Sequence, residues 1–125
     1  MRGDKGQALV EMAFVLPILI LLLLGIFEFG RAFNAYLTLQ HSTREGVRRG
    51  VTGATDQEIV DRIRQTAAAL DWSQVEVHIT PPEGERRSGM ELNVSTVYTF
   101  RFVVPVVSSW SEGIRLQTSL KMRME

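Results

Sequence analysis

A run of sixteen residues without a charged side chain, Met12 to Phe27, constrains the fold of this 125-residue chain more than any other feature. As a helix the run rises about 24 Å, and the wider segment 8–29 rises about 33 Å, close to the ~30 Å hydrocarbon thickness of a bilayer. A buried helix this rich in leucine needs protein on every side, which a 14.1 kDa chain cannot easily supply. The run therefore predicts a membrane-spanning helix over about residues 8–29.

Two residues inside the run affect its geometry, and the residues around it affect its orientation. Pro17 removes one backbone donor, so we expect the helix to bend there rather than end, and Gly25 is a second point where it can loosen. Arg2, Lys5 and the amino terminus precede the run, whereas Arg31 follows it. The positive-inside rule then predicts a cytoplasmic N-terminus and an exported C-terminal part.

Two other interpretations fit the same run. A secretory signal peptide also has a basic start and an apolar stretch, and Gly30-Arg31-Ala32 has the form of a small-x-small cleavage site. Charged side chains at Glu28 and Arg31 crowd the region before that cut and speak against it. A simple single-pass anchor that holds a small domain is the other interpretation.

The residues just before the run, Gly6-Gln7-Ala8-Leu9-Val10-Glu11, resemble the recognition sequence of type IV prepilins. In that family a peptidase in the membrane removes a short basic leader after glycine. A glutamate at the fifth mature position is then the only charge in an otherwise apolar helix. The resemblance implies cleavage between Gly6 and Gln7, with residues 1–6 as the leader and Glu11 at the fifth mature position.

A lone carboxylate such as Glu11 requires a physical explanation. A charge in or near hydrocarbon costs a few kcal/mol on insertion scales and is seldom there without a partner. The new amino terminus of a neighbouring subunit is one available partner, and such a pair would fix the axial offset between helices packed side by side. The alternative places Glu11 at the level of the lipid headgroups, where it favours the N-terminal helix dipole.

No turn signal follows the apolar run, so the long helix is expected to extend over residues 7–50. Glu28 and Arg31 can pair across one turn. Small or apolar residues recur at seven-residue spacing, and this seam permits close approach of another helix or of a sheet. The seam consists of Gly25, Ala32, Leu39, Gly46 and Gly53, with Gly50 beside it. The last three glycines also suit a fraying helix end, with Gly50 or Gly53 as the stop.

Residues 51–125 carry the pattern of a small α+β domain. Thr55 and Glu58 form a capping box that opens an amphipathic helix of about four turns. Alternation of apolar and polar residues then predicts three strands, near residues 75–80, 90–104 and 114–124. Their order predicts an antiparallel meander with one apolar face, covered by the amphipathic helix and the outer half of the long helix.

Two connecting segments of this domain differ in character. The segment 83–89 is polar, and we expect it to be mobile. The loop between the second and third strands contains Val106, Val107 and Trp110, which are candidates either for contact with a partner or for packing under the sheet edge. The predicted fold class is thus α+β, a long N-terminal transmembrane helix that continues into a small exported pilin-like domain.

Composition and motifs argue against nucleic-acid binding, a metal site and catalysis. Fourteen basic and fourteen acidic side chains cancel, so no bulk field attracts nucleic acid, and the chain contains no cysteine. His41 and His78 fall in different predicted elements, which argues against a metal site. Neither a G-x-S-x-G elbow nor a P-loop is present. We expect neither enzyme activity nor a cofactor.

Together these segments resemble the TadE-like family, the minor pilin-like proteins of tight-adherence (Flp) pilus systems. The resemblance is strongest over residues 3–50 and continues more loosely at 97–105 and at 122–123. It implies a pseudopilin in the cytoplasmic membrane that a prepilin peptidase processes and that helps to assemble or prime a pilus. Its implied partners are other pilin-like subunits, in a homo- or hetero-oligomer, and the assembly machinery. The alternative is an anchored accessory or binding domain that does not polymerise. The motifs that carry the resemblance are the leader glycine, Ala-Leu-Val-Glu, Leu-Pro-Ile-Leu, Gly-Ile-Phe-Glu-Phe-Gly-Arg and Arg-Glu-Gly-Val-Arg.

Overall fold

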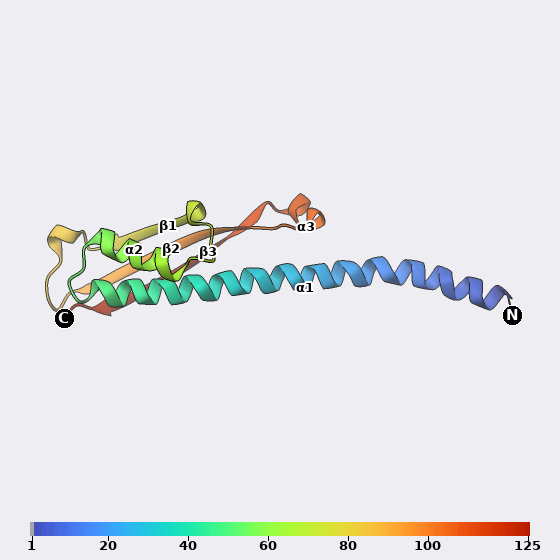
Figure 1. The fold of residues 1–125 in the computed structure, drawn as a ribbon, viewed down its shortest axis with the longest axis horizontal. Helices are drawn as coiled ribbons and strands as arrows, with labels where there is room; N and C mark the ends of the chain where they lie inside the picture. Colours follow the sequence, from blue (N-terminus) through green and yellow to red (C-terminus); the bar gives the residue numbers. More distant parts are fainter. Residues whose placement is uncertain (1) are drawn as a thin grey trace.

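The computed structural model describes residues 2–125, and Met1, the first residue of the expected leader, lies outside the described residues. The fold is the α+β arrangement that the sequence predicts, a long apolar helix followed by a short helix and a three-stranded sheet (Figure 1). The helices are α1 (Arg2–Gly50), α2 (Asp56–Thr66) and α3 (Pro105–Trp110), and the strands are β1 (Val75–Thr80), β2 (Glu91–Arg101) and β3 (Gly113–Arg123). Short 3-10 turns occupy Trp72–Gln74 and Glu83–Glu85.

Helix α1 runs unbroken for 49 residues and forms the long axis of the molecule. It continues through Pro17, and Figure 1 shows a gentle curve rather than a sharp kink. The helix already includes residues 2–6, so the expected leader and the segment after it form one continuous rod. It ends at Gly50, and Gly53 follows with φ of 95°, a conformation that glycine adopts without strain.

The sheet has the strand order β1-β2-β3, and both pairs are antiparallel, which confirms the predicted meander. Helix α2 opens with the predicted capping box, because the Thr55 side chain accepts from the Glu58 amide and the Glu58 carboxylate accepts from the Thr55 amide. It is shorter than expected and ends at Thr66. Strand β2 ends at Arg101 rather than near residue 104.

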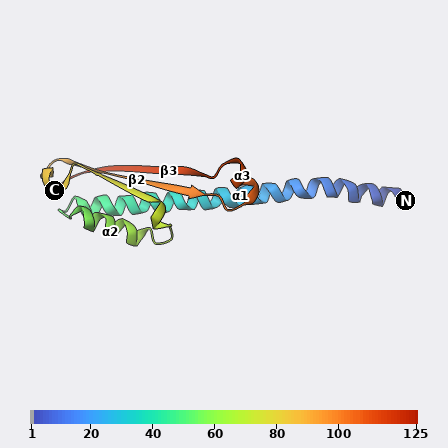
Figure 2. The same ribbon diagram turned by 90° about the horizontal axis from the view of Figure 1, so that it is seen from above.

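The C-terminal part of the chain forms two layers. Helix α2 lies beside the outer half of α1, and the sheet covers this helix layer, as Figures 1 and 2 show from two directions. The predicted cover of the apolar sheet face is therefore confirmed. The larger core cluster consists of Val47, Val51, Ala54, Ile59, Ile63, Leu92 and Val94. A second cluster, nearer the free half of α1, consists of Ala32, Ala35 and Phe100, with Leu70, Tyr98, Phe102 and Leu116 packed against it.

The helix ends at Gly50, one of the two predicted stops, but the expectation that it frays at Gly46 and Gly50 is wrong. Both glycines are buried at the points where α2 and β2 come closest to α1. A Cβ on Gly46 would stand 2.5 Å from Ile63 Cγ1, and one on Gly50 would stand 2.8 Å from Ile59 Cδ1 and would also meet Leu92. The absent side chains are what lets the two layers approach, so these glycines are packing positions.

This contact makes a quantitative prediction for the variant Gly46→Val. The added side chain collides with Ile63, and overpacking of this kind costs about 1–3 kcal/mol in free energy of unfolding. Denaturant unfolding of the full chain in detergent, followed by Trp72 emission in a Trp110→Phe background, measures the change because Trp72 packs on the same cluster. Gly30→Val is the matched control, since nothing lies within 4 Å of a Cβ there; equal stability of the two variants would contradict the packing role.

The polar segment 83–89, which is predicted to be mobile, makes contacts with the start of α2. It begins with the 3-10 turn Glu83–Glu85, and the Arg86 side chain after it is only 5% exposed. Arg86 donates to the Pro81 carbonyl at 3.0 Å and pairs with the Asp56 carboxylate in the first turn of α2. The segment is thereby fixed to the start of α2.

Candidate functional site

The N-terminal half of α1 projects beyond the rest of the molecule and contacts none of it (Figure 1). All residues from 3 to 23 are exposed, including large apolar side chains such as Leu9 (71%) and Phe14 (73%). By length and composition α1 is apolar enough to cross a membrane, and none of its most apolar 18-residue window is buried. An apolar surface of this extent marks contact with lipid or with another protein.

Glu11 lies near the start of this free surface and is itself exposed. Its Oε1 accepts a hydrogen bond from Gln7 Nε2 at 3.3 Å, one helical turn away. Apart from its chain neighbours and the backbone of its own helix, nothing lies within 4 Å of a Cβ placed on Gly6, so the bond between Gly6 and Gln7 lies on an unobstructed stretch of helix. No residue of the C-terminal domain reaches Glu11, whose carboxylate is therefore free to meet another molecule.

Glu28 lies at the other end of the apolar run and is, by contrast, fully engaged. Its side chain is 2% exposed, although the residue sits in the middle of a helix that is otherwise free on one side. The backbone amides of Val103 and Val104 each donate to Glu28 Oε1 at 3.2 Å. Arg31 Nη1 lies 3.1 Å from both carboxylate oxygens, and its guanidinium stacks over the Phe100 ring at 5.1 Å.

These contacts explain where β2 ends. Because the amides of Val103 and Val104 bond to Glu28, they are not available to continue the ladder with β3 beyond Arg101. The expected pair of Glu28 with Arg31 is present, but the two backbone donors were not predicted. One signal could have pointed to them: Glu28 shares a helix face with Ala32, Ala35 and Leu39, which pack in the core.

The seven-residue seam divides into two parts in the structure. Ala32 (8% exposed), Leu39 (0%) and Gly46 all pack within this chain, against the sheet and α2. Gly25 and Pro17 lie on the free half and contact nothing outside α1. Around Gly25 the helix surface forms a shallow apolar groove of about 690 Å³, lined by Leu21, Leu22, Gly25, Ile26, Phe29, Gly30 and Phe33.

Glu11 and this groove lie on one side of α1. Gly25 is fourteen residues after Glu11, which at 3.6 residues per turn places the two about 40° apart around the axis. Phe29 follows Glu11 by five full turns, or about 27 Å of rise. A neighbouring helix on this side would therefore meet the carboxylate at one end and the glycine groove at the other.

The segment with Val106, Val107 and Trp110 forms helix α3, not the expected irregular loop. Pro105 occupies its first turn, where a missing amide costs nothing. Trp110 is 89% exposed and Val106 48%, so packing under the sheet edge is wrong for these two side chains, whereas Val107 is half-buried. Contact of this segment with a partner stays a prediction.

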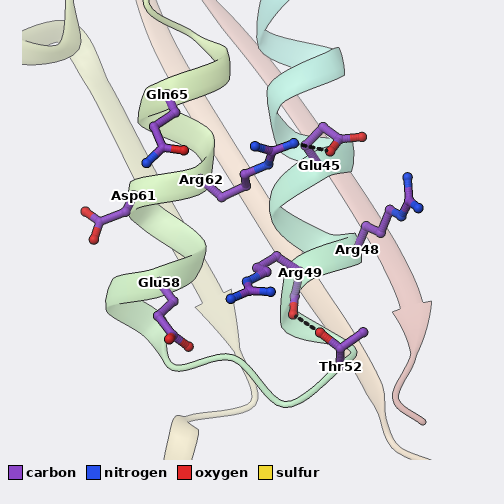
Figure 3. Close-up of a pocket in the computed structure, with 8 residues that line it drawn as sticks. All are labelled: Glu45, Arg48, Arg49, Thr52, Glu58, Asp61, Arg62 and Gln65. Carbon is purple, nitrogen blue, oxygen red and sulfur yellow. Dashed lines mark hydrogen bonds and ion pairs between the residues drawn. The ribbon is translucent and has the colours of Figure 1, made fainter.

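A polar cleft of about 620 Å³ lies at the far end of the molecule, between α1 and α2 (Figure 3). Arg62 Nη2 donates to Glu45 Oε2 at 3.0 Å, and this hydrogen bond holds the pKa of Glu45 below its ordinary value. Three arginines and three carboxylates line the cleft and offset one another, as in an ordinary solvated ion-pair surface. Its lining residues are Glu45, Arg48, Arg49, Thr52, Glu58, Asp61, Arg62 and Gln65. Within residues 2–125, no group of three or more histidine, aspartate or glutamate side chains is placed to hold a metal ion.

Fold and site together define a small α+β protein with one N-terminal apolar helix suited to membrane anchoring. A family model described as TadE-like protein matches residues 6–48, which confirms the resemblance of the N-terminal segment. The matched segment covers most of α1, with both Glu11 and Glu28. TadE-like proteins are structural proteins involved in tight-adherence pilus systems. Neither the curated proteins nor the solved structures give a match.

Proposed function

We propose that this protein is a minor pilin-like subunit, a pseudopilin, that helps to assemble or initiate a tight-adherence type IV (Flp) pilus. The observation that carries the proposal is the exposed apolar half of α1, most of which lies inside the segment matched by the family model. A helix that its own domain leaves uncovered must find lipid or other helices. In this proposal the same surface acts in two stages. It first contacts lipid in the membrane and later packs against neighbouring subunits.

In the first stage α1 spans the cytoplasmic membrane, with its N-terminus in the cytoplasm and the domain of residues 51–125 exported. Glu11 and Glu28 are separated by about 26 Å of helix rise, close to the ~30 Å thickness of the hydrocarbon. The two carboxylates thus bracket the span, with Glu28 neutralised by Arg31 and two amides on the exported side.

In the second stage a prepilin peptidase cuts between Gly6 and Gln7. The new ammonium group of one subunit pairs with Glu11 of the next, and this pair sets the offset between neighbouring helices. Glu28 cannot serve in that role because its hydrogen bonds are already made within the chain. Glu11 is the carboxylate near the apolar run that remains open to a partner.

Contacts between subunits are confined to the free half of α1. Pro17 and Gly25 lie on that half, and the groove around Gly25 admits the close approach of a second helix. Ala32, Leu39 and Gly46 support the fold of each subunit instead, because they are buried against its own sheet and α2. This account requires no metal, cofactor or nucleic acid, and its partners are other pilin-like subunits and the assembly machinery.

An anchored accessory domain that never polymerises is the second candidate, and the exposed Trp110 is the observation that favours it. Intact-mass measurement of the protein from cells that contain the peptidase separates the two. We expect a mature chain that begins at Gln7, retention of residues 1–6 in Gly6→Val, and normal processing of the matched control Gly3→Val, since neither glycine has a packing neighbour. An uncut wild-type chain in those cells would support the anchor.

A further inference from the structure

The connection between β2 and β3 ends in an uncharged, exposed tip. This α3 tip, residues 102–111, contains α3 and carries no charged side chain. Val103 is 67% exposed, Val106 48% and Trp110 89%, the last an unusual state for a tryptophan. Exposed charges begin on both sides of the tip, at Arg101 and Glu112.

The position of the α3 tip along α1 is fixed by Glu28. The hydrogen bonds from Val103 and Val104 hold the tip beside that residue, directly after the charge-free run that ends at Phe27. Both views of the ribbon place α3 at the end of the domain nearest the free half of the helix (Figures 1 and 2). At the same level α1 exposes Phe29 (75%).

We propose that the α3 tip is a second membrane contact, in which Trp110 and Val106 enter the lipid headgroup and upper acyl region where α1 leaves the bilayer. The inference rests on the membrane-spanning role of α1 proposed above. Tryptophan is enriched at that depth because its ring is apolar and its N–H finds polar partners there. The flanking charges of Arg101 and Glu112 stay at the headgroup level and limit how deep the tip can go.

A bilayer fits this surface better than a protein partner does. The tip is tied to the one helix among residues 2–125 that is apolar enough to cross the membrane, at the residue that follows its charge-free run. The lipid surface therefore lies within reach of the tip in every inserted molecule. The contact would hold the domain against the membrane at two points, α1 and the tip, and thereby restrict its rocking before assembly. Extraction into a pilus would then have to release Trp110 from lipid.

The test uses the full chain, inserted at low protein density into phosphatidylcholine vesicles with brominated acyl chains. The chain has two tryptophans, so Trp72→Phe leaves Trp110 as the reporter and Trp110→Phe leaves Trp72 as the matched control. Trp72 is half-buried and packs against the larger core cluster rather than at the α3 tip. We expect roughly twofold quenching of Trp110 relative to unbrominated vesicles, and little quenching of Trp72.

A second measurement does not depend on tryptophan. Because the chain has no cysteine, Val106→Cys can carry an environment-sensitive dye, with Ser88→Cys as the exposed control in the segment 83–89 at the far end of the domain. A blue shift on insertion at Val106→Cys alone supports the proposal. Unquenched Trp110 with a water-like dye signal would overturn the proposal. A blue shift of the dye that appears only at high protein density would also overturn it, because that result would assign the tip to a contact with a second copy. Vesicle flotation reports the insertion of α1 separately, and pilus assembly is not measured, so these outcomes do not depend on the proposed subunit role.

Discussion

Replacing Glu28 by alanine is expected to lower the free energy of unfolding of the domain by about 3 kcal/mol, the largest stability effect of any single side chain described above. The substitution removes the acceptor of the Val103 and Val104 amides and leaves the Arg31 guanidinium without its carboxylate. Denaturant unfolding of the full chain in detergent, followed by Trp72 emission in a Trp110→Phe background, gives the energy. Hydrogen exchange at the amides of Val103 and Val104 shows whether the loss of stability arises from these two hydrogen bonds.

Two further variants separate this effect from a general loss of charge. Glu28→Gln keeps a side-chain carbonyl that can accept from the two amides, so we expect it to be less damaging than alanine. Glu45→Ala removes the partly exposed ion pair with Arg62 and should cost less than about 1 kcal/mol. If Glu28→Ala costs no more than Glu45→Ala, and the two amides stay protected, Glu28 does not hold the α3 tip to α1.

The substitution Glu11→Ala is expected to abolish pilus assembly and to leave membrane insertion unchanged. Removing a carboxylate from the end of an apolar helix makes insertion easier, not harder. The only side-chain hydrogen bond that Glu11 makes among residues 2–125 is with Gln7. Loss of the Glu11 carboxylate therefore affects contacts between molecules rather than the fold of one molecule. Surface pilus yield, together with membrane content of the subunit, measures both effects in cells that depend on this chain.

Met12→Ala is the matched control for Glu11→Ala, because it truncates the neighbouring exposed side chain without touching a charge. It should assemble nearly normally. Glu11→Asp keeps the charge and should retain part of the yield. Normal assembly by Glu11→Ala would remove the register role and return the protein to the class of anchored accessory domains.

The parts of the fold that sequence could predict are those set by local pattern. The charge-free run, the Thr55–Glu58 capping box and the alternation of three strands each depend on residues close together in the chain, and all three features are present. Their arrangement into two layers follows because one apolar sheet face and two helices have few ways to cover each other.

What sequence could not predict depends on contacts between distant residues. Glu28 and Val103 are 75 positions apart, and no local pattern assigns a backbone amide to a particular carboxylate. The seam predicted that Gly46 permits a close approach, but glycine near a helix end signals a stop as readily, and only the position of Ile63 distinguishes the two. Helix α3 could not be predicted for a different reason: its six residues are too few to show helical periodicity.

The most direct test of the account is whether the free half of α1 packs against other pilin-like subunits through one side. Since the chain has no cysteine, Gly25→Cys and Phe27→Cys can each carry a thiol-linked photo-cross-linker and be compared in membranes from pilus-forming cells, with and without Glu11→Ala. Phe27 is exposed like Gly25 but lies about 200° around the helix. The account predicts cross-links to neighbouring subunits at Gly25→Cys, few at Phe27→Cys, and loss of the Gly25→Cys cross-links when Glu11 is alanine. Equal cross-linking at the two positions, or none at either, would contradict it.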